Sequence, residues 1–128
     1  MERVIIDSGV VIAVERGVIE MPLGPGAALA AVSAAELLVG VELADERHRA
    51  GRSVRVEAVL EGLTVIPYDL AIAREHSRLS AHARRTGRPR GAHDLQIAAT
   101  ARATGRTVLT TDRGAFDDLP GVKVRVLG

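Results

Sequence analysis

Four acidic side chains of this 128-residue chain occupy positions at which a parallel α/β sheet would form a catalytic site. Asp7 directly follows the first apolar run, and Asp112 directly follows a later one. Glu36 lies one turn into an expected helix, and Asp94 begins another. If the strands are parallel, the first two acids and Glu36 share the carboxyl end of the sheet, where ligands bind in such folds. Asp94 joins them only if the loop over residues 89–92 brings the start of its helix there.

Such a cluster of carboxylates has a defined chemistry. Four carboxylates at one end of a small sheet repel one another by roughly several kcal/mol in a low dielectric. Nearby cations must offset this repulsion, and the single lysine, Lys123, is not among them. All-oxygen ligands suit Mg²⁺ or Mn²⁺ and not zinc. A carboxylate-held Mg²⁺ activates water and stabilises a leaving oxygen, which is the chemistry of phosphodiester hydrolysis.

Each acid also has a purely structural explanation. Glu36 could complete a capping box with Ser33. Asp94 in a first helical turn suits the helix dipole, and Asp112 could simply form a turn. Asp7 could cap the helix that follows it. The site hypothesis therefore depends on the four acids lying together, and not on any one of them.

The elements that must position these acids alternate between apolar runs and helical patterns. Strands are expected at residues 4–6, 29–32, 64–67, 107–110 and 122–127. Helices are expected at residues 10–16, from Ser33 to about Leu43, at 45–63 with a break near Gly51, at 69–86 and at 92–104, with one turn at 112–116. Asp69 also follows a strand, but we assign it only an N-cap role. Strands separated by helices predict parallel βαβ units.

Composition limits the class of protein. With 47% hydrophobic and 26% charged residues, the chain is expected to fold as one domain over residues 1–128. The absence of cysteine excludes disulfides, a thiolate zinc site and a cysteine nucleophile. No apolar run reaches the roughly 18 residues of a membrane span, and Asp7 interrupts any early signal-like stretch. We expect a soluble, cytoplasmic protein with no membrane partner.

The basic residues indicate a contact with phosphate. The formal net charge is only +1, so overall charge does not indicate a nucleic-acid binder. The cations are clustered, however, and one cluster falls in and beside an expected loop: Arg84, Arg85, Arg88 and Arg90. Arginine forks suit phosphates. We predict that this cluster contacts RNA, with a solvated helix face as the alternative.

Four segments, taken together and in order, resemble the sequence blocks of PIN-domain ribonucleases, and of VapC toxins in particular. They are residues 5–13 (IIDSGVVIA), 33–40 (SAAELLVG), 91–101 (GAHDLQIAATA) and 109–112 (LTTD), the last followed by Phe116 and by LPGV at 119–122. The third block is the most specific. The resemblance covers nearly the whole chain.

This resemblance implies a three-layer α/β/α sandwich with a five-stranded parallel sheet. It implies that Mg²⁺ or Mn²⁺ is bound by Asp7, Glu36, Asp94 and Asp112. It further implies endonucleolytic cleavage of structured RNA, such as transfer or ribosomal RNA, which inhibits translation. The expected partners are a second copy of the chain and a VapB-like antitoxin, through which alone operator DNA would be bound.

The acids can be given separate roles as a hypothesis. Asp7 and Asp94 make the main metal contacts, and Glu36 is a ligand or the general base for the attacking water. Asp112 binds a second ion, or the first ion through water.

Three neighbouring positions qualify these roles. Ser8 and Thr110 could support the site by hydrogen bonds to acids or phosphate, although a local backbone bond is the alternative for each. Gly9 is a departure, because the family usually has Asn or Ser at this position. Any side-chain contribution from position 9 is therefore absent.

Rival enzyme classes fit the sequence less well. A receiver-type phosphoacceptor domain needs a lysine near the carboxyl end of the last strand, whereas Lys123 lies near its amino end. A haloacid-dehalogenase-like phosphatase needs an aspartate two residues after Asp7, where Gly9 stands. A catalytically inactive PIN module that only binds RNA or protein remains as the alternative, although retention of all four acids argues against it.

Overall fold

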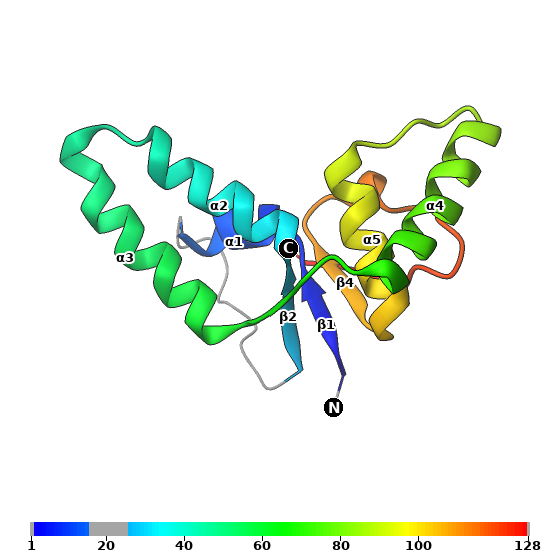
Figure 1. Cartoon of the computed structure of the whole chain (residues 1–128), viewed down its shortest axis with the longest axis horizontal. Helices are drawn as coiled ribbons and strands as arrows, with labels where there is room; N and C mark the ends of the chain where they lie inside the picture. The colour runs from blue at the N-terminus through cyan, green and yellow to red at the C-terminus, as the bar shows by residue number, and fades with distance from the viewer. Residues whose placement is uncertain (1, 16–25, 128) are drawn as a thin grey trace.

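The computed structural model describes residues 2–15 and 26–127, and its centre is a five-stranded sheet (Figure 1). The strands are β1 (Val4–Ile6), β2 (Ala27–Ala30), β3 (Thr64–Ile66), β4 (Thr107–Thr110) and β5 (Val124–Val126). The helices are α1 (Ser8–Glu15), α2 (Ala31–Leu43), α3 (Glu46–Gly62), α4 (Leu70–Arg85) and α5 (Ala92–Thr104), with a 3₁₀ turn, η1, at Arg113–Ala115. Every strand pairing is parallel, and the strand order is β3-β2-β1-β4-β5. The predicted parallel α/β sheet is confirmed.

Helices cover both faces of this sheet. Side chains alternate between the two faces along each strand, so a strand of apolar residues contributes to a core on each face. Val4 and Ile6 pack into a core that includes residues of α1, α2 and α3, whereas Ile5 packs on the other side with residues of α4 and α5. Figure 1 shows the pair α2–α3 on one side of the sheet and the pair α4–α5 on the other. The three-layer α/β/α arrangement expected from the family resemblance is confirmed.

The boundary between β2 and α2 differs from the prediction. The strand expected at 29–32 spans Ala27–Ala30, and α2 begins at Ala31 and not at Ser33. Pairing of β2 with β3 ends at Ala30 opposite Ile66, and Ala30 is the extended N-cap residue of the helix without a side-chain cap. The chain therefore passes from strand to helix with no connecting loop.

Three other predicted boundaries need correction. Helix α3 continues through Gly51 without a break, since one internal glycine costs only about 1 kcal/mol in a helix of 17 residues. Helix α1 starts at Ser8 and not at Val10, and the end predicted at residues 16 and 17 lies outside the described residues. Strand β5 keeps only the middle of the predicted 122–127 span.

Helix α5 begins and ends as predicted, and it sets the geometry of the site. Gly105 adopts a left-handed conformation (φ +65°) and ends the helix just before β4 begins. Because α5 leads directly into the amino end of β4, the helix starts at the opposite, carboxyl end of the sheet. None of the helices in the described part of the chain is both long and apolar enough to cross a membrane.

Candidate active site

The strand ends bring the first two acids together. Strands β1 and β4 are neighbours, and the backbone N–H of Asp7 donates to the carbonyl of Leu109 at 2.9 Å. Asp7 therefore lies just beyond β1, and Asp112 lies two residues beyond β4 at the same end of the sheet. Glu36 lies in the second turn of α2, which follows β2, the other neighbour of β1.

Asp94 reaches the same place from α5. It lies in the first turn of this helix, whose N-cap residue, Gly91, provides no side-chain hydrogen bond. The condition left open by the sequence is therefore met: the helix that precedes β4 starts at the carboxyl end of the sheet.

The pKa shifts indicate that the four carboxylates interact electrostatically. Burial is the largest cause that raises the pKa of Asp94, and the charges of Asp7, Asp112 and Glu36 raise it further. Burial likewise raises the pKa of Asp7, as do the charges of Glu36 and Asp112. Hydrogen bonds from the Thr110 hydroxyl and the Ser8 backbone partly oppose the shift at Asp7. The acids form one coupled anionic cluster, in which charge is disfavoured without a cation.

Thr110 connects two of the acids. Its hydroxyl donates to Oδ2 of Asp7 at 2.8 Å and accepts from the backbone N–H of Asp112 at 3.0 Å. The side chain of Thr110 is fully buried. Oδ1 of Asp112 accepts from the N–H of Gly114 at 3.0 Å, so Asp112 also caps the η1 turn. Thus both alternatives weighed for Thr110, a bond to an acid and a local backbone bond, occur together.

Glu36 is held by an unexpected partner. Its Oε1 atom lies 2.8 Å from Nδ1 of His93, which forms an ion pair when the imidazole is protonated. This contact does not have the geometry of a hydrogen bond, so the buried Oε1 atom of Glu36 has no hydrogen-bond donor. The capping box with Ser33 is wrong, because Ser33 lies inside α2 and its hydroxyl is buried without a hydrogen-bond partner. The sequence placed His93 beside Asp94 but gave no sign of its contact with Glu36.

The cluster offers the donor type that a hard divalent cation needs. Glu36 presents a buried oxygen without a hydrogen-bond donor, and burial together with the charges of the neighbouring acids raises the pKa values of Asp7 and Asp94. In residues 2–15 and 26–127, no three histidine or acidic side chains are already arranged as a coordination shell. Metal binding therefore fits these residues in kind, provided that side chains such as Glu36 rotate away from their present contacts.

The predicted arginine cluster divides into two parts. Arg90 has a side chain only 8% exposed and donates to the carbonyl of Gly114 at 2.7 Å. Arg88 pairs with Asp117 at 3.1 Å and with Asp118 at 3.6 Å. These two arginines fix the segment that follows Asp112.

Arg84 and Arg85, in contrast, lie exposed in the last turn of α4. Neither makes an ion pair within the part of the chain that the structure describes. Both are accessible to an external phosphate and, among the described residues, have no competing acid.

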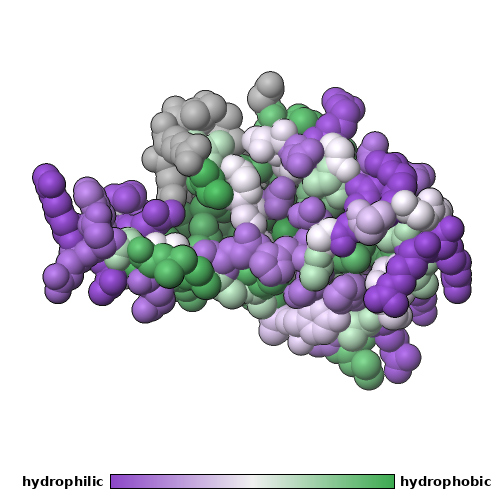
Figure 2. All heavy atoms as spheres, turned by 90° about the horizontal axis from the view of Figure 1, so that it is seen from above, coloured by the Kyte–Doolittle hydropathy of each residue, from purple (hydrophilic) through white to green (hydrophobic). Residues whose placement is uncertain are grey.

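A separate apolar surface lies on α2 and α3. Its members are exposed aliphatic side chains: Leu38, Val39, Leu43 and Val54. Figure 2 shows hydrophobic surface along the arm formed by these helices, with hydrophilic side chains beside it and at the tip. A shallow cavity of about 430 Å³ joins this surface to the acids, since it is lined by Val39, Glu36 and His93 among others. Exposed apolar surface of this kind is typical of a protein interface.

Comparison with known proteins identifies the family. The PIN domain family profile matches residues 4–122. The tRNA(fMet)-specific endonuclease VapC of Salmonella typhimurium is 32% identical over 98 residues, which cover 75% of this chain and 71% of that protein. Ribonuclease VapC of Rickettsia bellii is 27% identical over 124 residues, covering 94% and 92%. The chain belongs to the PIN domain family.

Within this family, the chain is similar in particular to VapC proteins, the toxin components of VapBC pairs. The DNA-bound VapBC complex of Salmonella typhimurium contains a chain that superposes with a TM-score of 0.89 at 22% identity and covers 98% of each chain. The resemblance that the four sequence blocks indicated is confirmed.

Proposed function

We propose that the chain is a divalent-metal-dependent endoribonuclease, the toxin of a VapBC-type pair, which acts in the cytoplasm on structured RNA such as transfer or ribosomal RNA. One observation carries the proposal: Asp7, Glu36, Asp94 and Asp112 form one electrostatically coupled cluster at the carboxyl end of the sheet. Relatives named as a tRNA(fMet)-specific endonuclease and as a ribonuclease support the reaction class.

In this mechanism the four carboxylates hold Mg²⁺ or Mn²⁺, with Asp7 and Asp94 as the main ligands. When bound, the ion supplies Lewis-acid activation of water and of the phosphodiester. Thr110 orients Asp7 through its 2.8 Å hydrogen bond. Glu36 accepts the proton of the attacking water or completes the ligand set. Asp112, with Oδ1 committed to Gly114, contributes its other oxygen.

His93 contacts Glu36 in the structure. Its imidazole is exposed (57%), and its Nδ1 atom lies 2.8 Å from Oε1 of Glu36. Release of Glu36 from His93 is then part of forming the active site. His93 is a positioning residue in this account and does not touch the reacting atoms.

RNA is held by arginine and not by stacking, since Tyr68 and Phe116 are the only aromatic residues and Phe116 is buried. Arg84 and Arg85 contact the phosphate backbone directly. Arg88 and Arg90 face the same region of the molecule, and they also fix the turn that carries Asp112.

A VapB-like antitoxin and a second copy of the chain are the proposed protein partners. The exposed apolar residues of α2 and α3 give a surface for these contacts, and the cavity beside Glu36 connects that surface to the acids. An antitoxin segment lying there would block the site. Operator DNA would be bound by the antitoxin.

A matched pair of variants tests the proposed activity. Asp94→Asn removes one cluster charge, whereas Asp69→Asn makes the same chemical change at an acid that only caps α4 through Ile72. Each variant is expressed in bacteria without the neighbouring antitoxin gene, and RNA 5′ ends are sequenced. We expect new RNA ends and growth arrest with wild type and Asp69→Asn, and neither with Asp94→Asn. Cleavage by a folded Asp94→Asn protein would contradict the proposal and favour an inactive binding module.

A further inference from the structure

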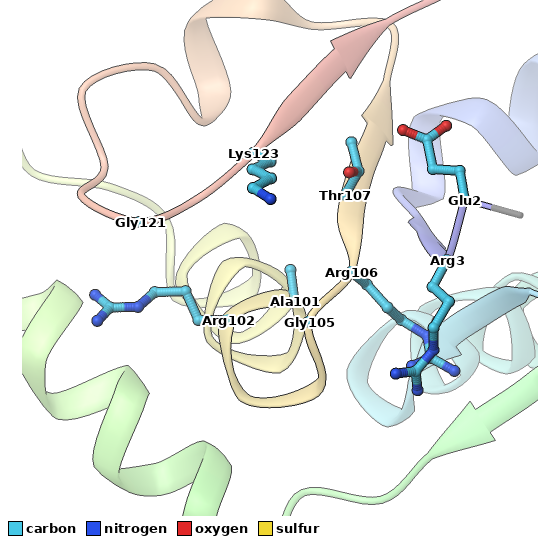
Figure 3. Close-up of a pocket in the computed structure, with 9 residues that line it drawn as sticks. All are labelled: Glu2, Arg3, Ala101, Arg102, Gly105, Arg106, Thr107, Gly121 and Lys123. Carbon is cyan, nitrogen blue, oxygen red and sulfur yellow. The ribbon is translucent and has the colours of Figure 1, made fainter.

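A second charged site lies at the opposite, amino end of the sheet. A cavity of about 390 Å³ opens where β1, β4 and β5 begin, beside the last turn of α5 (Figure 3). Arg3, Arg106 and Lys123 line it from positions just before these three strands. Along β1, Arg3 and Asp7 are separated by four residue steps, or about 13 Å. The cavity is therefore distinct from the acidic cluster.

The backbone fixes the positions of these three cations. The carbonyl of Arg3 accepts from the N–H of Thr107 at 2.9 Å, and that of Lys123 accepts from the N–H of Val108 at 2.8 Å. The N–H of Arg106 donates to the carbonyl of Ala101 in α5 at 2.9 Å. These backbone hydrogen bonds place the three residues at the amino ends of neighbouring strands, where their side chains line the same cavity.

The three cations are not neutralised by the protein. In the described residues, no acid forms an ion pair with Arg3, Arg106 or Lys123. Glu2, the one acid among the described residues that line the cavity, pairs with Arg125 on β5.

The fourth cation of the cavity has its own partners. Arg102 pairs with Glu75 at 3.0 Å and donates to the carbonyl of Pro120, and Figure 3 shows its guanidinium turned toward α4. The uncompensated charge therefore belongs to the other three side chains.

The clustering of these cations is unfavourable for Arg106. Its Nε atom is buried without a hydrogen-bond partner, and its guanidinium overlaps that of Arg3 in the view of Figure 3. Burial lowers the pKa of Arg106, and the charge of Arg3 lowers it further. Two arginines that repel each other, one of them with an unused donor, are stabilised when an anion with several oxygen atoms binds to both.

We propose that this cavity is a phosphate-binding site, in which Arg3, Arg106 and Lys123 bind the phosphate group of a nucleotide or of an RNA backbone. Guanidinium forks match phosphate oxygens, and the lysine adds a point charge. The hydroxyl of Thr107 lies in the same cavity and provides a neutral donor. The cavity is larger than a phosphate ion, so it also has room for an attached sugar. The inference does not depend on the proposed nuclease activity.

Binding measurements on the full chain in EDTA test the site without cleavage. The probes are inorganic phosphate, adenosine 5′-monophosphate and a 12-nucleotide RNA, measured by calorimetry at fixed ionic strength. Arg106→Gln and Lys123→Gln remove cavity charges, and Arg47→Gln removes an exposed charge on α3 as the matched control. We expect affinity for at least one probe to fall about tenfold in each cavity variant and to stay unchanged in the control.

The pattern of losses identifies the source of the phosphate. Loss with RNA alone assigns the cavity to the RNA backbone, whereas loss with phosphate and the mononucleotide assigns it to a small ligand. Equal affinities of cavity and control variants for all three probes would overturn the proposal. If Arg106→Gln fails to fold, the exposed Lys123→Gln decides the outcome. A ligand-binding role also predicts that Arg106→Gln is as thermally stable as wild type without phosphate, which a purely structural arginine would not allow.

Discussion

Neutralising one acid of the cluster should not destabilise the protein in the absence of metal. Removal of a carboxylate that caps a helix elsewhere in the chain should destabilise it. Asp94→Asn removes a charge that three carboxylates repel. It also loses the favourable interaction of Asp94 with the start of α5, about 0.3–1 kcal/mol. Because one pKa unit corresponds to about 1.4 kcal/mol, modest relief of repulsion offsets that loss. We expect the free energy of unfolding to change by between about 0 and +1 kcal/mol.

Asp69 supplies the contrast. Its Oδ1 accepts from the N–H of Ile72 at 2.9 Å and caps α4. Asp69→Ala should lower the free energy of unfolding by about 1 kcal/mol, or the melting temperature by roughly 4 °C. Thermal and urea unfolding in EDTA at neutral pH measure both variants. A loss of 1 kcal/mol or more in Asp94→Asn would refute the interpretation of Asp94 as part of a repulsive cluster.

The pH dependence of the stability tests the direction of the Asp94 pKa shift independently. The folded-state pKa of Asp94 is raised above its ordinary value of 3.8. Between these two pKa values the native state therefore binds more protons than the unfolded state. The stability of wild type should fall, relative to Asp94→Asn, as pH rises from 3.8 through the raised pKa. Below 3.8 both side chains are neutral, and the two proteins should differ least. A stability difference independent of pH would contradict this explanation.

Three further predictions concern residues around the cluster. Arg90→Ala should lower the free energy of unfolding by about 2 kcal/mol, because the carbonyls of Gly114 and Asp117 lose a nearly buried guanidinium donor; chemical denaturation measures it. Replacing Arg84 and Arg85 together with Ala should leave melting unchanged but reduce the salt dependence of RNA binding by roughly two phosphate contacts, and an unchanged slope would count against them. Gly9→Ala should be neutral or stabilising by up to about 1 kcal/mol in thermal melts, since its new Cβ meets only the exposed Thr111 hydroxyl at 3.3 Å. A clear loss of stability would show that Thr111 cannot move.

The elements predicted best carry their own local signals. Strand β1 is a fully buried apolar run that ends at an aspartate, and α5 ends at a glycine whose φ is +65°. The boundary of β2 and α2 has no such signal, because residues 27–35 are nearly all small and apolar. There the end of the strand is set by pairing with β3, which local sequence does not report.

The position of Asp94 was within reach of sequence reasoning. A helix that leads directly into the amino end of a parallel strand must start at the carboxyl end of the sheet. The predicted order of α5 and β4 therefore already implied that Asp94 lies with Asp7.

Other contacts were not predictable in this way. Arg90 pairs with Asp117, and His93 lies against Glu36, 57 positions earlier. A single sequence shows that such charges exist, but it does not show which of them face each other. The role of the arginine cluster was consequently predicted from composition alone, and only the structure separates Arg88 and Arg90, which pair with acids of the protein, from the exposed Arg84 and Arg85.

Diffraction from crystals grown with Mn²⁺ tests the central claim most directly. Anomalous scattering locates manganese without reference to any assumed mechanism. The account predicts a strong peak among Asp7, Glu36, Asp94 and Asp112, with carboxylate oxygens about 2.0–2.3 Å away and Glu36 released from His93. Crystals of Asp94→Asn should lack the peak. Manganese bound only elsewhere, or four acids that keep their present contacts at saturating Mn²⁺, would contradict it.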